Sequence, residues 1–174
     1  LEALGIDEFW IDDCFKKMAV PADALRLGEN VVTVKTNFMR TTNVEAIYLV
    51  GDFGVSLNGH RSTLTALPEK IGNQDLRCYN LPFYTGAVTW HIPAEEIAAL
   101  PKASDGERIL LSPQSFTGGL MKVRADGGEE QILAWDPYEA DVTDAVREGR
   151  AIDVTVVGTR RNTFGPLHLV PVLH

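Results

Sequence analysis

Several features that would assign a protein to a class at first sight are missing from this sequence. It has only two cysteines in 174 residues, Cys14 and Cys78, which are too few for a disulfide framework and have no metal-ligand spacing. Its longest apolar stretches fall far short of the ~20 residues that a helix needs to span a bilayer. Unpaired, buried thiols are therefore expected, and no membrane partner is expected.

Basic residues are scarce relative to acidic ones. The 16 lysines and arginines are outnumbered by 24 aspartates and glutamates, so the formal net charge is −8. Because the acidic residues are scattered rather than gathered in blocks, the composition argues against nucleic acid or an anionic membrane surface as a partner. A neutral ligand is more compatible with this charge. The hydrophobic content of 45% is that of an ordinary globular protein able to bury a core.

The motifs of the common enzyme classes are missing as well. No Gly-x-Ser-x-Gly, Walker loop or Gly-x-Gly-x-x-Gly occurs, and the four histidines are isolated. The acidic pairs Asp12-Asp13, Glu95-Glu96 and Glu129-Glu130 are adjacent, so in a strand they point to opposite faces and cannot flank one glycosidic bond. Oxygen ligands for Ca²⁺ are available in Asp12, Asp13 and Asp52, but no Asp-x-Asp-x-Asp loop supports a site. We therefore expect no cofactor.

A short segment occurs twice in the chain. Residues 23–28 and 144–149 both run from Asp-Ala to a closing Gly, and each precedes a β-branched run, at 31–34 and 152–157. This pattern is typical of a helical turn that ends at a left-handed Gly and leads into a strand. Two copies indicate two related modules, of which the first is truncated.

The remaining pattern predicts a mainly β chain. Strands are expected where β-branched and aromatic residues lie between Gly, Pro, Asn and Asp clusters, at residues 9–11, 31–36, 46–50, 87–92, 108–111, 120–125 and 152–157. Several short strands at fairly regular spacing favour a β-sandwich, with a barrel as the alternative.

Only short helices and tight turns are expected between the strands. Residues 95–100 and 141–147 predict single-turn or two-turn helices, the second capped by Asp141 or Thr143. The Asn58-Gly59 dipeptide is a hairpin signal, because Gly and Asn tolerate the positive φ of tight turns.

Three segments, taken in order, resemble parts of a known domain. Residues 83–93, with Tyr84-Thr85-Gly86 ahead of a strand that ends at Pro93, are similar to the opening of the jelly-roll sugar-binding domain in β-galactosidase and β-glucuronidase type glycoside hydrolases. Residues 123–127 resemble a strand that ends in Asn-Gly there, with Asp126 in place of the Asn. Residues 135–143 resemble the segment of that domain that runs from Pro and an aromatic residue to Asp, Ile or Val, and Thr.

Two further segments, 47–55 and 161–168, resemble parts of large bacterial glycosidase-like proteins, including some related to α-L-rhamnosidases. The insertion at 56–81 has no counterpart in the simple sugar-binding domain. The resemblance implies a galactose-binding-like jelly-roll β-sandwich, which we expect at 44–174. From the repeated segment we expect the C-terminal remnant of a first β-sandwich at 1–43.

The same resemblance implies a non-catalytic role. In that enzyme family the module stands beside a catalytic barrel that carries both carboxylates, and this chain has neither the length nor the βα pattern of such a barrel. The implied function is to support the catalytic domain of the same parent chain or to present carbohydrate substrate to it. Two alternatives stay open: an autonomous carbohydrate-binding module, and a purely structural interdomain or protein-interaction sandwich.

Carbohydrate recognition would use aromatic faces for the apolar side of a pyranose ring and planar polar groups for its hydroxyls. The residues expected to make such contacts are Trp135, Tyr138, Arg160, Arg161 and Asn162. Trp135 and Tyr138 lie in a turn-rich connection that favours exposure, whereas Trp90 and Tyr84 are expected to build the core. The three polar residues could equally face a neighbouring domain.

Overall fold

The structure, a computed structural model, describes residues 8–10, 12–40, 42 and 47–160. The chain divides into two compact units, Leu1–Tyr48 and Leu49–His174. The module boundary predicted between residues 43 and 44 lies slightly ahead of this division. That the units are two related sandwich modules stays a prediction.

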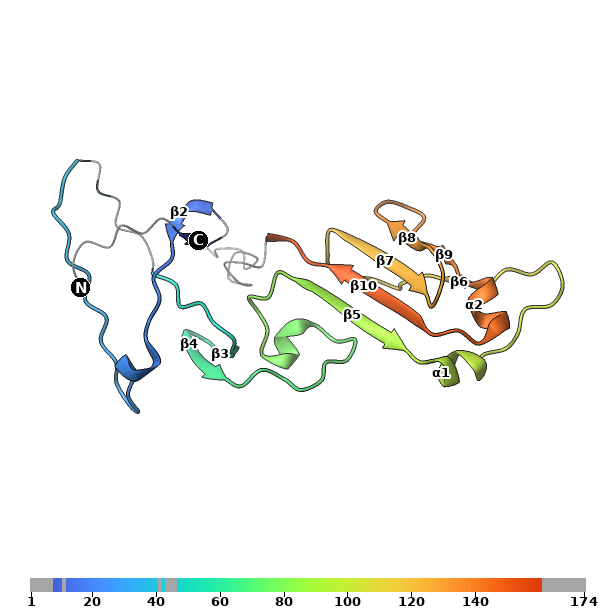
Figure 1. Cartoon of the computed structure of the whole chain (residues 1–174), viewed down its shortest axis with the longest axis horizontal. Helices are drawn as coiled ribbons and strands as arrows, with labels where there is room; N and C mark the ends of the chain where they lie inside the picture. Colours follow the sequence, from blue (N-terminus) through green and yellow to red (C-terminus); the bar gives the residue numbers. More distant parts are fainter. Residues whose placement is uncertain (1–7, 11, 41, 43–46, 161–174) are drawn as a thin grey trace. The chain divides into compact units, whose positions relative to one another are not determined.

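The first unit has little regular structure in its described part. Strands β1 (Phe9–Trp10) and β2 (Asp12–Lys16) form an antiparallel pair, and η1 (Ala22–Ala24) is a single 3₁₀ turn (Figure 1). The strand predicted at 31–36 is wrong: these residues are coil, and the side chains of Val31, Val32 and Val34 are more than half exposed. β-Branched residues form a strand only beside a partner, and no described segment pairs with them.

The two copies of the repeated segment therefore differ in structure. The second copy forms helix α2 (Thr143–Glu148), then Gly149 at φ 67°, then strand β10 (Ile152–Val157), as predicted. In the first copy Gly28 also has a positive φ, of 96°, but the η1 turn ends at Leu25 and no strand follows. Similar local sequence thus produced a strand only where two neighbouring strands were present to accept it.

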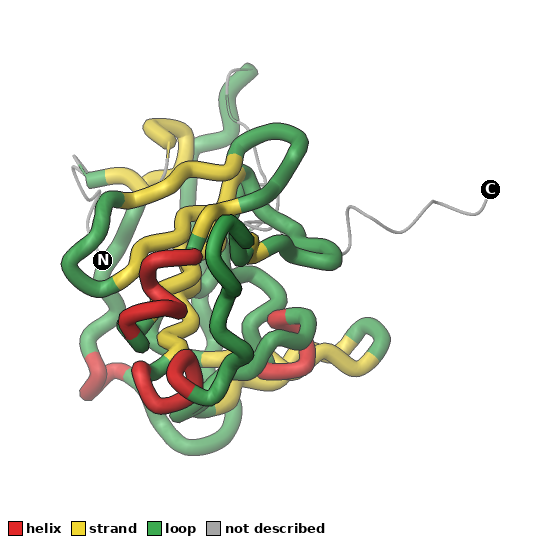
Figure 2. The backbone as a smooth tube through the Cα atoms, turned by 90° about the vertical axis from the view of Figure 1, so that its right-hand side faces the viewer, coloured by secondary structure: helices red, strands yellow, loops and turns green. Residues whose placement is uncertain are grey.

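A four-stranded antiparallel sheet forms the centre of the second unit, in the order β5-β10-β7-β8. Strands β5 (Ala87–Ile92), β7 (Leu120–Ala125) and β10 lie where the sequence predicts them. Strand β8 (Glu130–Leu133) was not predicted, because it is short and half polar and is defined by its pairing with β7. A tight connection joins β7 to β8, while the longer connections from β5 to β7 and from β8 to β10 contain the other short elements and much of the loop drawn in green in Figure 2.

Strands β3 (Gly54–Asn58) and β4 (Arg61–Thr65) form a hairpin with Gly59-His60 as its two-residue loop. Gly59 has φ 58°, which confirms the turn signal at Asn58-Gly59. The predicted strand at 46–50 is wrong for residues 47–50, which are coil, and residue 46 lies outside the described residues.

A second small antiparallel pair joins β6 (Leu110–Leu111) to β9 (Ala140–Asp141), so the strand predicted at 108–111 is shorter than expected. The helices are short: η2 (Leu76–Tyr79), α1 (Ala94–Ala98) and α2. Helix α1 begins after Pro93 with two glutamates in its first turn, a sequence that complements the positive end of the helix dipole.

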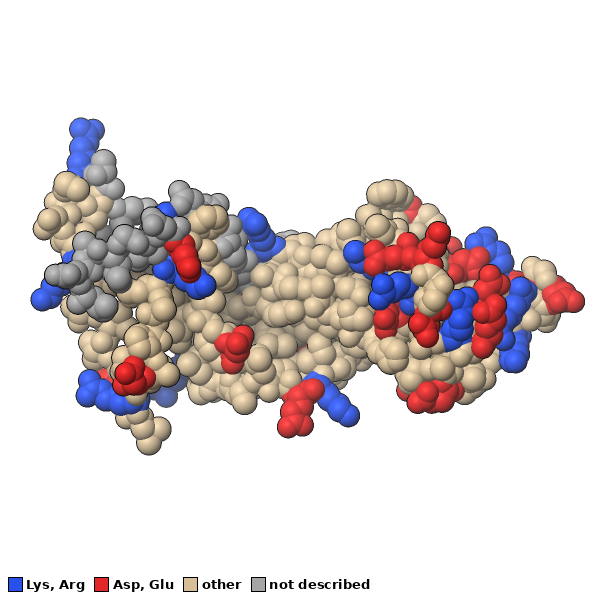
Figure 3. Space-filling model, viewed as in Figure 1, with Lys and Arg blue, Asp and Glu red and all other residues tan. Residues whose placement is uncertain are grey.

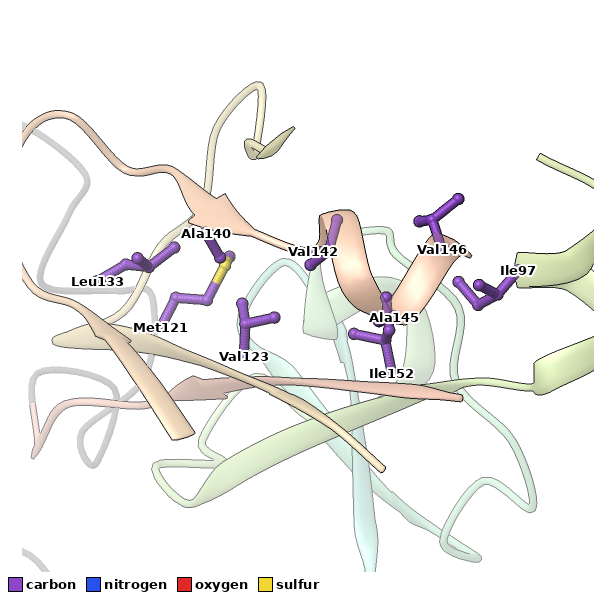
Figure 4. Packing of buried hydrophobic residues seen from close by; sticks show 9 residues of the cluster. All are labelled: Ile97, Met121, Val123, Leu133, Ala140, Val142, Ala145, Val146 and Ile152. Atoms are coloured by element: carbon purple, nitrogen blue, oxygen red, sulfur yellow. The ribbon is translucent and has the colours of Figure 1, made fainter. Parts of the chain in front are cut away.

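The hydrophobic core lies between the four-stranded sheet and the layer that contains α1, α2 and β9. Figure 4 shows side chains of β7 and β10 pointing toward those of α2. The cluster consists of Ile97, Met121, Val123, Leu133, Ala140, Val142, Ala145, Val146 and Ile152. Because side chains alternate along a strand, one face of the sheet carries the residues of this cluster and the other face, whose residues are half-buried or exposed, points away from it.

The prediction of a mainly β chain with antiparallel sheets is confirmed, while the jelly-roll arrangement stays a prediction. In the described part of the chain, no helix combines the length and the apolar character needed to cross a membrane.

Candidate functional site

The structure separates the residues that were predicted to contact carbohydrate. Trp135 is 76% exposed, in the loop between β8 and β9. Tyr138 instead packs edge to face on Phe116, with ring centroids 5.2 Å apart, and lies against the core. Arg160 is exposed at the end of the described chain, and Arg161 and Asn162 lie outside the described residues. Of the two aromatic candidates, Trp135 is therefore the exposed one.

Three residues that were expected to be buried in the core are half-buried or exposed. Trp90 is half buried, and its Nε1 donates a hydrogen bond to the carbonyl of Gly72 at 2.9 Å. Tyr84 is 40% exposed, and its hydroxyl donates to the carbonyl of Ala87 at 3.0 Å, so its assignment to the core is wrong. Cys78 is likewise an exposed thiol, in η2. The side chain of Cys14 lies outside the described part.

A polar groove with a volume of about 710 Å³ lies beside α2. The charged side chains that line it are Glu107, Arg108, Glu129, Asp141, Asp144, Arg147 and Arg150. Figure 3 shows acidic and basic side chains interleaved over this end of the second unit. Because both signs alternate in the groove, it suits a ligand with hydrogen-bond donors and acceptors better than one with a strong net charge.

Asp141, at the end of β9, is the centre of the hydrogen bonds in this groove. Its Oδ1 accepts from the backbone N–H of Thr143 at 3.0 Å and from the Thr143 hydroxyl at 2.5 Å. Its Oδ2 accepts from Nε of Arg108 at 2.9 Å and lies 2.8 Å from Nη2 of the same residue. The hydrogen bonds from Thr143, and then those from Arg108, lower the pKa of Asp141 from 3.8 to about 2. This carboxylate is the opposite of a general acid, which requires a raised pKa.

Hydrogen bonds around Asp141 connect β8, β9 and the segment just before β6 to α2. The side-chain amide of Gln131 on β8 donates to the carbonyl of Asp141 at 2.8 Å and accepts from its N–H at 3.0 Å. The hydroxyl of Thr143, a buried residue, accepts from the N–H of Ile109 at 2.8 Å. The polar atoms at the base of the groove are therefore already engaged by the protein itself.

The remaining arginines of the groove also have partners. Nη2 of Arg147 lies 3.4 Å from the carbonyl of Glu107 and 3.5 Å from that of Ser104. Nη1 of Arg150 donates to the carbonyl of Asp126 at 2.7 Å, while its buried Nε lies 2.8 Å from Glu148 without the alignment of a hydrogen bond. These contacts hold the loops on either side of α2 and favour a structural role for the groove.

The sequence signalled only part of this network. Asp141 or Thr143 was predicted to cap the helix, because an acidic or hydroxyl residue before a helical pattern is a cap signal. The N-cap is instead Val142, which makes no side-chain cap hydrogen bond, although Asp141 does accept from the N–H of Thr143. Arg108 and Gln131 carry no local signal, since their partners come from other strands.

The described residues hold no group of three His, Cys, Asp or Glu side chains arranged to bind a metal ion. Of the aspartates considered for calcium, Asp52 is exposed, and the side chains of Asp12 and Asp13 lie outside the described part.

Comparison of the chain with protein-family models, with curated proteins and with solved structures gives no match in any of the three. The resemblance to a galactose-binding-like domain therefore stays a prediction that rests on the order of the segments at 83–93, 123–127 and 135–143.

Proposed function

We propose that this chain is a non-catalytic accessory domain of a glycoside hydrolase-like protein, built as a galactose-binding-like jelly roll. It supports the catalytic domain of the same parent chain or presents carbohydrate to it. The observation that carries the proposal is the indole of Trp135, which is 76% exposed in a loop at the edge of the sheet. An exposed aromatic face matches the apolar side of a pyranose ring, and its N–H can donate to a hydroxyl.

The electrostatics of the chain support a neutral ligand. The net charge of −8 disfavours anionic polymers, and the charged groups of the groove are balanced in sign. The most extensively hydrogen-bonded carboxylate, Asp141, is held ionised and engaged by Thr143 and Arg108, which supports a structural rather than a catalytic role for it.

A second candidate function is a purely structural sandwich that docks on another protein domain. The exposed side chain of Ile132, close to Trp135 in the sequence and 57% exposed, favours this alternative, because neighbouring exposed apolar groups are typical of protein interfaces.

Affinity gel electrophoresis of the purified chain in soluble neutral polysaccharides, such as galactomannan and xyloglucan, tests the proposal. The chain should be retarded in at least one of them. Trp135→Ala should remove the retardation, Trp135→Phe should retain part of it, and Tyr84→Phe, a matched aromatic control, should leave it unchanged. Retardation by none of the polysaccharides would favour the structural alternative.

An assay with nitrophenyl glycosides tests the non-catalytic part of the proposal. The chain should release no nitrophenol. Turnover that disappears on substitution of a single carboxylate would show that the chain is an enzyme.

A further inference from the structure

The face of the four-stranded sheet that points away from the core carries an ordered array of side chains. Met121, Val123 and Ile152 point into the core, so their neighbours along β7 and β10 point outward. The strand register arranges these outward residues in three rows: His91, Asp153 and Arg124; Thr89, Thr155 and Lys122; Ala87, Val157 and Leu120. We call these three rows the outer face.

Side chains of the two polar rows are held by contacts across the strands. The hydroxyls of Thr89 and Thr155 are 2.8 Å apart, and Nδ1 of His91 lies 2.8 Å from Oδ1 of Asp153. Nζ of Lys122 donates to Glu130 on β8 at 2.9 Å. Side chains fixed in this way lose little further conformational entropy when a ligand binds.

These contacts leave hydrogen-bonding groups available to a ligand. In the Thr89–Thr155 pair one hydroxyl donates to the other, so the second hydroxyl keeps its own O–H. Each threonine hydroxyl oxygen also has acceptor lone pairs, and Nε2 of His91 is a further polar atom beside the one that contacts Asp153. The outer face therefore offers both a donor and an acceptor, as the hydroxyls of a sugar require.

The charges on the outer face cancel. Lys122 pairs with Glu130, and Nη2 of Arg124 lies 3.8 Å from Asp153. Because these opposite charges are paired, this surface gives little long-range attraction to a polymer of either sign, and the net charge of −8 opposes an anionic one. This charge distribution matches a neutral, polyhydroxylated ligand.

Trp135 lies at the apolar end of the same sheet. The register pairs Leu133, the last residue of β8, with Met121, and Met121 is the neighbour of Leu120 in the apolar row. Trp135 follows shortly after the end of β8. Trp135 therefore lies beyond the Leu120 end of the sheet, whereas the row of His91, Asp153 and Arg124 lies at the opposite end.

We propose that the outer face binds a neutral glycan chain. The apolar row contacts the C–H faces of sugar rings, while Thr89, Thr155 and His91 exchange hydrogen bonds with hydroxyl groups. This inference rests on the proposed function. It assigns binding to the outer face rather than to the groove beside α2, whose polar atoms are engaged by the protein.

The test compares the full chain with a Thr89→Val, Thr155→Val double variant, using galactomannan and xyloglucan as probes and polygalacturonate as the anionic comparator. Val keeps the shape and strand preference of Thr but removes the hydroxyl, so a thermal melt should show that the variant is folded. We expect the double variant to bind the neutral glycan about tenfold more weakly, the effect of losing a hydrogen bond or two. Thr89→Ser, which keeps the hydroxyl, should bind like the original chain. Arg147→Gln, in the groove, should also leave the affinity unchanged.

Several binding results would overturn the assignment of glycan binding to the outer face. If the original chain binds a neutral glycan and the double variant binds it equally well, the outer-face assignment is overturned while the proposed function stands. The assignment is likewise overturned if Arg147→Gln weakens binding as much as the double variant, or if polygalacturonate binds more tightly than the neutral glycans. If the original chain binds none of the glycans, the carbohydrate-presenting part of the proposed function fails, and the outer-face assignment fails with it.

Discussion

The hydroxyl of Thr143 donates to Oδ1 of Asp141 at 2.5 Å while accepting from the backbone N–H of Ile109 at 2.8 Å. One side chain thus links the end of β9, the start of α2 and the residue before β6. Because Thr143 is buried, these hydrogen bonds are shielded from water and decide how the helical layer is attached to the strands.

Thr143→Val should destabilise the second unit by about 1 to 3 kcal/mol, because the N–H of Ile109 would lose its partner in a buried site. Thr143→Ser, which keeps the hydroxyl, should cost less. The midpoints of urea unfolding measure both effects. Equal midpoints for the Val variant and the original chain would mean that this hydroxyl does not hold the layers together.

The stability should depend on pH through Asp141. Its pKa in the folded chain, about 2, is below its ordinary value of 3.8. A carboxyl whose pKa is lowered by folding contributes stability above its unfolded pKa and loses that contribution as the pH falls through its folded pKa. Asp141→Asn should therefore have a lower Tm than the original chain near neutral pH, and the difference should shrink between about pH 4 and about pH 2.

Asp136→Asn is the control for this pH series, since Asp136 is exposed. Its Tm should follow that of the original chain throughout. A difference for Asp141→Asn that stays constant down to the lowest pH would contradict the assigned pKa.

Gly149→Val should destabilise the second unit by more than about 1 kcal/mol, because the left-handed conformation at φ 67° is costly for a residue with a Cβ. The nearest atom to an added Cβ is Cβ of Ala98 at 3.7 Å, an ordinary contact, so the cost is one of backbone conformation. Gly149→Asn should cost less, since Asn tolerates this region. Chemical denaturation curves that coincide for Val and Gly at this position would refute the assignment.

Ile152→Ala should destabilise by about 2 to 5 kcal/mol, because Ile152 is 1% exposed and its truncation leaves a cavity between β10 and α2. Ile132→Ala is the matched control: it removes the same atoms from the exposed side of β8, and its effect should stay within about 0.5 kcal/mol. Guanidinium unfolding curves measure the stability of both variants. Similar losses of stability in the two variants would show that the core is assigned to the wrong face of the sheet.

The two parts of the chain should differ in their ability to fold alone. The core cluster lies wholly between Ile97 and Ile152, whereas the described part of the first unit contains a two-stranded pair and many exposed apolar side chains. A chain shortened to residues 44–174 should melt cooperatively, while residues 1–43 should not, since an isolated strand pair is marginal in water. Circular dichroism melts of both pieces test this. A cooperative melt of residues 1–43 would contradict the prediction that this segment cannot fold alone.

Local sequence was sufficient to predict those strands and turns whose own residue types favour that structure. Strands β5, β7 and β10 were predicted at their observed positions because each is an uninterrupted run rich in β-branched or apolar residues. The left-handed Gly149 was predicted because few other residues tolerate that backbone conformation. Trp135, a candidate for sugar contact, was predicted to be exposed from its turn-rich surroundings, and it is.

Tertiary structure decided everything that depends on a partner distant in sequence. Residues 31–34 are as β-branched as parts of β10, yet they remain coil, whereas the half-polar segment Glu130–Leu133 becomes β8 through its pairing with β7. Tyr138 packs on Phe116, and Asp141 is surrounded by Arg108, Gln131 and Thr143, because the chain reversals between β6 and α2 bring these residues together. Strand pairing and side-chain networks require two segments at once, so the pattern within either segment alone carries no information about them.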